Sequence, residues 1–112
     1  MVTRSFNPVE GQFGVDLVAA PNEVVKAALD GTVTMSTWTL ETGYVLQIQH
    51  DNELMSVYKH NATLFKSVGQ KVLAGDAIAI VGNSGELTTG PHLHFELWHD
   101  RVPLNPLEYI VF

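Results

Sequence analysis

The 112-residue sequence contains no cysteine, few basic residues and no long apolar run. The absence of cysteine excludes disulfide bonds, thiolate metal sites and cysteine nucleophiles. Six Lys plus Arg against twelve Asp plus Glu give a formal net charge of -6, and an acidic chain is a poor polyanion binder, so we expect no nucleic-acid partner. No stretch approaches the roughly 20 apolar residues of a transmembrane helix. The first residues, MVTRSFNP, lack the apolar segment of a signal peptide, so we expect none in this chain.

What is present is the composition of an ordinary globular protein, with 46% hydrophobic and 16% charged residues. A chain of this length can bury a sizeable core without covalent staples. We therefore expect residues 1–112 to form a single domain, and we expect that domain to be part of a longer protein.

Short β-strand patterns separated by turn signals cover most of the sequence. β-Branched and aromatic residues dominate residues 32–40, 44–50, 54–60, 77–82 and 92–98. Gly-, Asn- and Asp-containing pairs lie between these stretches and are typical of turns. Residues 21–29 fit either a helix or a strand that enters a turn. The pattern predicts an all-β sandwich or barrel.

Two histidines lie close together in the last predicted strand, within the sequence GPHLHFEL. Side chains two apart on a strand project from one face, so His92 and His94 point together while Leu93 and Phe95 face the core. Two imidazoles at this spacing suit a metal ligand beside a catalytic base. Taken alone, the pair is equally compatible with two surface histidines on a half-buried strand.

A carboxylate interrupts the apolar run FGVDLVAAP near the start of the chain. Alternation places Gln12, Gly14 and Asp16 on one strand face. It places Phe13, Val15 and Leu17 on the other. Gly14 would leave room above the backbone between two polar side chains. A buried Asp16 needs a cation or a metal as partner, although aspartate also commonly binds nearby backbone amides.

These segments together resemble the LytM, or M23, family of zinc metallopeptidases over about residues 6–109. The most specific part is VGNSGELTTGPHLHFEL, followed by PLNPLEY. The resemblance implies a two-sheet antiparallel β core, sandwich- or barrel-like and built as a duplicated hybrid motif, with a groove over one sheet. It also implies a cell-envelope location, periplasmic or extracellular, and an activity directed at the peptide cross-bridges of peptidoglycan.

The resemblance assigns roles to particular residues. Asp16 and His94 match two zinc-ligand positions, and His60 and His92 match the two histidines that activate water and stabilise the developing oxyanion. The first ligand position of the family falls on Gln12. A catalytic zinc usually has three protein ligands, and a carboxamide oxygen is a weaker zinc donor than imidazole. We therefore expect zinc to bind weakly through Gln12 or a water, or to be absent, unless the missing ligand comes from elsewhere in the parent protein or from a partner.

We interpret the sequence as an M23-like domain with an impaired zinc site that binds a cell-wall peptide or regulates a cell-wall hydrolase. Its partner would then be a peptidoglycan peptide or a cell-envelope protein. The alternative is an active or weakly active zinc endopeptidase that cleaves peptidoglycan cross-bridges. A third interpretation starts from VGQKVLAGDAIAIV, which also resembles lipoyl, biotinyl and phosphotransferase carrier domains. The chain has no lysine in the exposed hairpin-tip motif that a lipoyl or biotinyl carrier needs.

Overall fold

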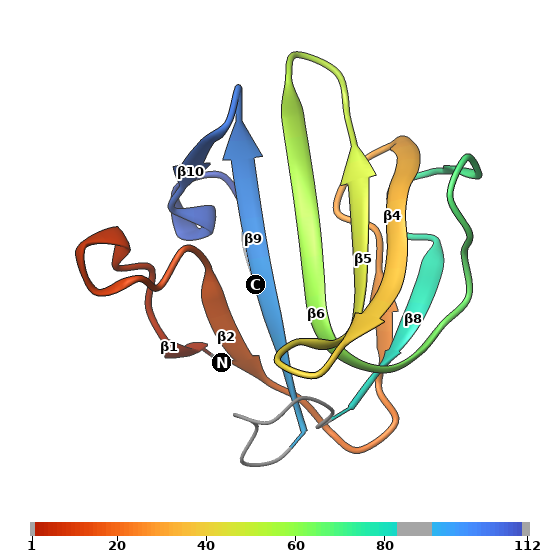
Figure 1. Ribbon diagram of the computed structural model, residues 1–112, viewed down its shortest axis with the longest axis horizontal. Coiled ribbons are helices and arrows are strands. Elements are labelled where there is room, and N and C mark those ends of the chain that lie inside the picture. The colour runs from red at the N-terminus through yellow and green to blue at the C-terminus, as the bar shows by residue number, and fades with distance from the viewer. Residues whose placement is uncertain (1, 83–90, 111–112) are drawn as a thin grey trace.

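The computed structural model describes residues 2–82 and 91–110 as an almost entirely β structure (Figure 1). Its strands are β1 (Val2–Arg4), β2 (Val15–Val18), β3 (Val24–Lys26), β4 (Gly31–Thr39), β5 (Gly43–Gln49), β6 (Leu54–Leu64), β7 (Lys71–Val72), β8 (Ala77–Val81), β9 (His92–His99) and β10 (Val102–Leu104). Two 3-10 turns, η1 (Pro8–Glu10) and η2 (Pro106–Glu108), complete the described elements. Within these ranges, no helix is long and apolar enough to cross a membrane.

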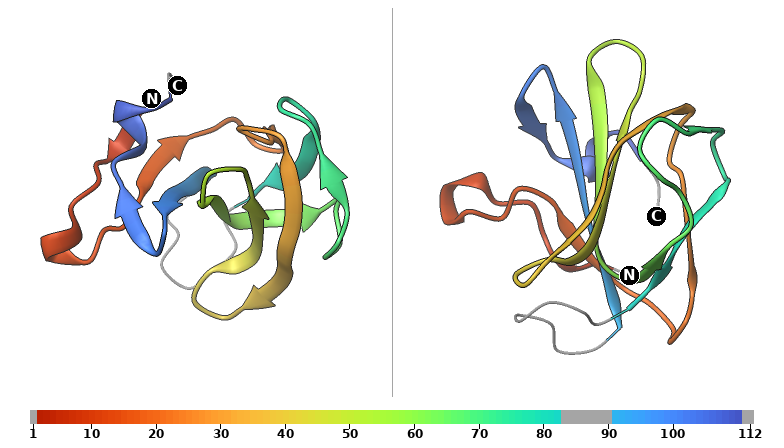
Figure 2. Two further views of the ribbon diagram at one scale, coloured as in Figure 1. Left: turned by 90° about the horizontal axis from the view of Figure 1, so that it is seen from above. Right: turned by 45° about the vertical axis from the view of Figure 1, so that its right-hand side comes forward.

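All strand pairs are antiparallel, which confirms the predicted fold class. The main sheet has the order β1-β2-β9-β6-β5-β4-β7, and β10 pairs with β9. β3 and β8 form a short second layer, which joins the main sheet at the end of β6. The sheet curves strongly, so that from above the strands surround a barrel-like interior (Figure 2). The long strand β6 therefore pairs with strands of both layers.

The core lies inside this curved sheet and consists mainly of aliphatic side chains. Its fully buried members include Val15, Val33, Leu46, Ile48, Ile78, Phe95 and Leu97. Removing such side chains from water is the main source of stability in a domain of this size. The inward positions of β9 are Phe95 and Leu97, so the residues between them face the opposite side of the sheet.

A polar network crosses one end of the core. The hydroxyl of Tyr58 lies 2.8 Å from the hydroxyl of Ser56 and accepts a hydrogen bond from the backbone of Ala28. Ser56 in turn lies 2.7 Å from Nε2 of His50, whose Nδ1 is 2.6 Å from the carbonyl of Asp30. His50 is therefore a structural histidine that connects the end of β5 to the turn before β4.

Most of the predicted strand stretches coincide with strands of the structure. Within residues 21–29, the structure contains the strand β3 and no helix. β6 continues four residues beyond the predicted 54–60 stretch, to Leu64. The segment NSGELTTG, residues 83–90, belongs to the family-like motif but lies outside the described residues.

Candidate functional site

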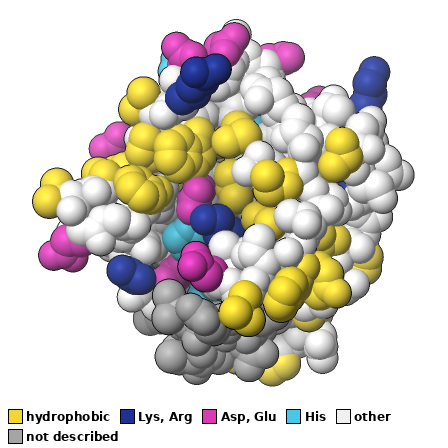
Figure 3. Space-filling view, viewed as in Figure 1, with side chains coloured by type: hydrophobic (Ala, Val, Ile, Leu, Met, Phe, Trp, Pro, Cys, Tyr) yellow, Lys and Arg dark blue, Asp and Glu magenta, His cyan; other side chains and the backbone are white. Residues whose placement is uncertain are grey.

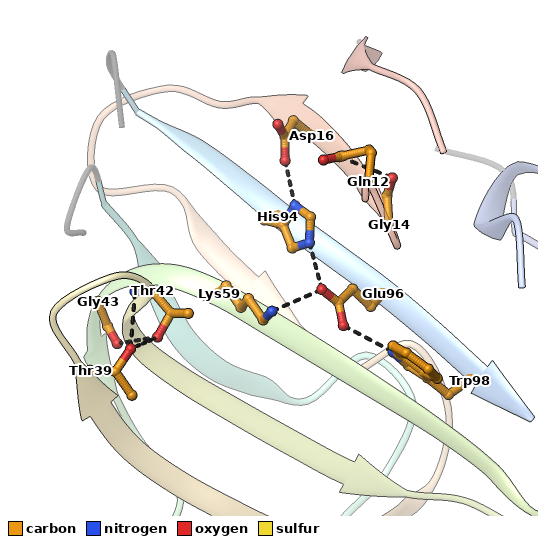
Figure 4. A network of polar contacts seen from close by, with 10 residues as sticks. All are labelled: Gln12, Gly14, Asp16, Thr39, Thr42, Gly43, Lys59, His94, Glu96 and Trp98. Atoms are coloured by element: carbon orange, nitrogen blue, oxygen red, sulfur yellow. Dashed lines mark hydrogen bonds and ion pairs between the residues drawn. The ribbon is translucent and has the colours of Figure 1, made fainter. Parts of the chain in front are cut away.

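The candidate site lies on the outer face of the main sheet, where β2, β9 and β6 are adjacent. In the strand register, Asp16 of β2 is paired with His94 of β9, which is paired in turn with Lys59 of β6. Oδ1 of Asp16 lies 2.6 Å from Nδ1 of His94 (Figure 4). The predicted association of Asp16 with the HxH motif is therefore formed, across 78 residues of sequence.

A row of alternating charges continues from this pair along the sheet. Nε2 of His94 donates to Oε2 of Glu96 at 2.7 Å, and Nζ of Lys59 lies 2.9 Å from the same oxygen. Both ring nitrogens of His94 therefore lie within hydrogen-bond distance of a carboxylate oxygen. Burial alone would lower the pKa of His94, but the hydrogen bonds to Asp16 and Glu96 outweigh burial and raise it.

The pKa values of the two carboxylates in the row shift in the opposite direction from that of His94. Burial alone would raise the pKa of Asp16, but the hydrogen bond and the charge of His94 outweigh it, so the pKa is lowered. Burial likewise opposes ionisation of Glu96, and the hydrogen bonds from His94 and Lys59 overcome it to lower its pKa to about 2. The lowered pKa values therefore favour the ionised forms of both carboxylates.

His60 and His92 lie beside this row. The ring centroids of His60 and His92 are 5.1 Å apart, and those of His60 and His94 are 6.1 Å apart. His60 has a φ of 67°, a left-handed conformation that is unusual for a residue other than glycine. It lies in β6 where the register with β5 shifts, so a bulge reorients the chain at this position. The structure thus brings together the histidines of β6 and β9.

Gln12 is buried, with 5% of its surface exposed, and lies next to Asp16 in Figure 4. Its amide Nε2 donates to the carbonyl of Gly14 at 3.0 Å, so this nitrogen is bound to the adjacent backbone. The prediction of free space above the backbone of Gly14 is wrong. A Cβ there would lie 2.2 Å from the carbonyl oxygen of Phe95, because the two backbones approach closely.

The predicted orientation of the Phe13 side chain is also wrong. Strand alternation placed Phe13 with the core residues, but regular strand structure begins only at Val15. Phe13 is 39% exposed, and its ring centroid lies 5.9 Å from that of Trp98. Because Trp98 follows His94 by four residues in β9, it lies on the site's face of the sheet. The two rings form an aromatic wall beside the charged row, and we call this pair the Phe13–Trp98 wall.

Sequence reasoning missed Glu96, Lys59 and Trp98. The signal for two of them was present, because the alternation that pairs His92 with His94 continues to Glu96 and Trp98. Lys59 required the register between β6 and β9, which the sequence does not specify locally. In the space-filling view, charged and histidine side chains form a strip across the face, with hydrophobic side chains above it and to its lower right (Figure 3).

The zinc site implied by the family resemblance can be tested against these donors. Asp16 Oδ1 and His94 Nδ1 face one another and would be two ligands, with Glu96 behind the imidazole in the way that carboxylates often support metal-bound histidines. The third position holds an amide. Among residues 2–82 and 91–110, no group of three His, Asp or Glu side chains could hold a metal ion. The described residues do not fit the three-ligand set of a catalytic zinc.

Comparison with known proteins places this geometry in a family. The sequence model described as "Peptidase family M23" matches residues 10–106. Among curated relatives, the murein hydrolase activator NlpD of Escherichia coli K12 is 32% identical over 111 residues, which are 97% of this chain and 29% of NlpD. The peptidoglycan DD-endopeptidase ShyC of Vibrio cholerae is 34% identical over 107 residues, 92% of this chain and 24% of ShyC.

Solved structures agree with the sequence comparison. A zinc-containing peptidase from Vibrio cholerae superposes with a TM-score of 0.89 at 30% identity, over 100% of this chain and 37% of that one. The chain thus spans only about a quarter to a third of these relatives' lengths. The match covers the strands that carry Asp16, His60 and His94 and extends over most of the described fold. The chain belongs to peptidase family M23.

Proposed function

We propose that this chain is an M23 domain of the cell envelope that binds a peptidoglycan peptide or a cell-wall hydrolase in its groove, with zinc chemistry that is impaired or lost. The observation that carries the proposal is the arrangement around the first ligand position. Gln12 uses its amide nitrogen on the adjacent carbonyl of Gly14, while His94 Nδ1 is bound to Asp16.

The proposed roles are those that the family resemblance implies. Asp16 and His94 occupy the ligand positions that remain, His60 and His92 keep the positions of the general base and oxyanion partner, and Gln12 is the degenerate ligand. Any zinc would bind weakly. The domain, residues 1–112, would be one part of a longer envelope protein.

The relatives of this chain support a binding role and are also compatible with catalysis. NlpD is named as a murein hydrolase activator, which fits a domain that acts on another enzyme, whereas ShyC is named as an endopeptidase. The alternative, a weakly active zinc endopeptidase, is favoured by one observation, the preserved cluster of His60, His92 and His94 rings.

Metal content and wall cleavage distinguish the two functions. The domain would be purified without chelator and its zinc measured, and it would then be incubated with dye-labelled peptidoglycan, alone and with a murein hydrolase of the same cell. We expect substoichiometric zinc, no dye release by the domain alone, and increased release when the hydrolase is present. Stoichiometric zinc together with cleavage by the domain alone would overturn the proposal in favour of the endopeptidase.

The Gln12→His variant tests the placement of Gln12. An imidazole at this position would complete a three-ligand set, so zinc affinity should rise by at least about 10-fold, the lower end of what a single supporting residue contributes. Gln70→His is the matched control, because Gln70 is exposed and lies in the loop before β7. Equal zinc affinities of the two variants would show that Gln12 is not at a ligand position.

A further inference from the structure

Glu96 is a buried carboxylate with three donors around it. Only 6% of its surface is exposed, and it lies between the Asp16–His94 pair and the Phe13–Trp98 wall. Oε2 accepts from Nε2 of His94 at 2.7 Å and from Nζ of Lys59 at 2.9 Å. Oε1 accepts from the indole nitrogen of Trp98 at 2.9 Å. Both carboxylate oxygens are therefore in contact with side chains of β6 and β9.

The first consequence concerns the imidazole. The two nitrogens of His94 lie on opposite sides of its ring, so anchoring Nε2 to Glu96 directs Nδ1 to Asp16. Figure 4 shows these groups in one line, with Lys59 approaching Glu96 from β6. Without the Glu96 carboxylate, the ring could turn about its side-chain bonds, and its orientation toward Asp16 would no longer be unique.

The second consequence concerns the wall. The indole of Trp98 is amphipathic, and its N–H finds its partner in Oε1 of Glu96. This bond holds the indole whose ring centroid lies 5.9 Å from that of Phe13. One carboxylate thus contacts both the imidazole of His94 and the indole of Trp98.

We propose that Glu96 is the positioning residue of this groove, held by Lys59, and that it sets His94 and Trp98 together for ligand binding. The inference rests on the proposed function, because it assigns Glu96 a role in the groove that would bind the wall peptide or the hydrolase. Glu96 acts through its neighbours and does not itself touch the ligand.

The test combines a spectroscopic readout with a binding readout. In 15N-labelled protein, the ring nitrogens of His94 and the indole N–H of Trp98 report the two orientations, and the ring of His50, held by Asp30 and Ser56, is the internal reference. Binding is measured with soluble peptidoglycan fragments and with a purified murein hydrolase of the same cell. The variants are Glu96→Gln and Lys59→Met. Their matched controls are Glu108→Gln and Lys71→Met, at exposed positions away from the groove.

We expect Glu96→Gln to shift the signals of both His94 and Trp98, to leave His50 unchanged, and to weaken binding by about 10-fold or more. Lys59→Met should shift the same signals by less. If Glu96→Gln does not fold, the signals and the binding of Lys59→Met test the inference in its place. Signals of His94 and Trp98 that match those of the control variants would overturn the inference, as would shifted signals with unchanged binding. If the wild-type domain bound neither probe, the proposed function would fail, whereas unshifted signals would refute the positioning role separately.

Discussion

Acidification should selectively remove the stability that the ionised Glu96 carboxylate gives to the fold. Burial alone would raise the pKa of Glu96, but the hydrogen bonds from His94 and Lys59 lower it to about 2, from an ordinary value of 4.5. A folded-state pKa below the unfolded one stabilises the fold at pH values above 4.5. This stabilisation is lost as the pH falls from about 4.5 toward 2.

The size of the effect follows from the two pKa values. Their difference corresponds to about 3 kcal/mol of unfolding free energy near neutral pH, since each pKa unit is worth about 1.4 kcal/mol. About 1.4 kcal/mol of this remains at about pH 3, so roughly 2 kcal/mol is lost between about pH 6 and pH 3. The carboxylate is almost fully buried, so solvent screening reduces this figure little.

Urea unfolding followed by circular dichroism at constant ionic strength measures this loss. Wild type and Glu96→Gln would be compared at each pH, because their other acidic side chains are the same and largely cancel. The stability difference between the two proteins should shrink by about 2 kcal/mol from pH 6 to pH 3. Glu108→Gln, at an exposed position, should show no such trend. A wild-type to Glu96→Gln difference that stays constant within about 0.5 kcal/mol would refute the idea that Glu96 is an ionised, hydrogen-bonded partner in the fold.

Two further predictions concern the backbone around the site. His60→Gly should be about 1 kcal/mol more stable than His60→Ala, because glycine adopts the φ of 67° without strain and alanine does not; equal urea midpoints would show that the bulge imposes no strain. Gly14→Ala should lose about 1–3 kcal/mol or more, because its Cβ would lie 2.2 Å from the carbonyl oxygen of Phe95. A Gly14→Ala protein with wild-type stability would show that β2 can move away from β9 at little cost.

Local patterns accounted for much of the site. The two-residue period of a strand correctly placed His92 and His94 on one face and Phe95 in the core. The same period failed for Phe13, because regular pairing of β2 with β9 starts at Val15 and the residues before it follow no strand geometry. Alternation is reliable only where a neighbouring strand enforces the pleat, and the sequence near Gly14 does not reveal where that begins.

The motif resemblance led from residue types to the family, and the comparison with known proteins confirmed it. It could not reveal how Asp16, His94 and Glu96 are held together across the sheet. That depended on Lys59, which reaches Glu96 only because β6 lies beside β9 in a particular register.

The sequence by itself therefore determined the fold class and the faces of the last strand. These properties follow from side-chain period, turn chemistry and residue type, all of which are local. Only the tertiary structure decided that Asp16, His94, Glu96 and Lys59 form one alternating row and that Phe13 meets Trp98. These contacts join strands far apart in the chain, and their electrostatic strength depends on burial, which arises when the sheet closes around its core.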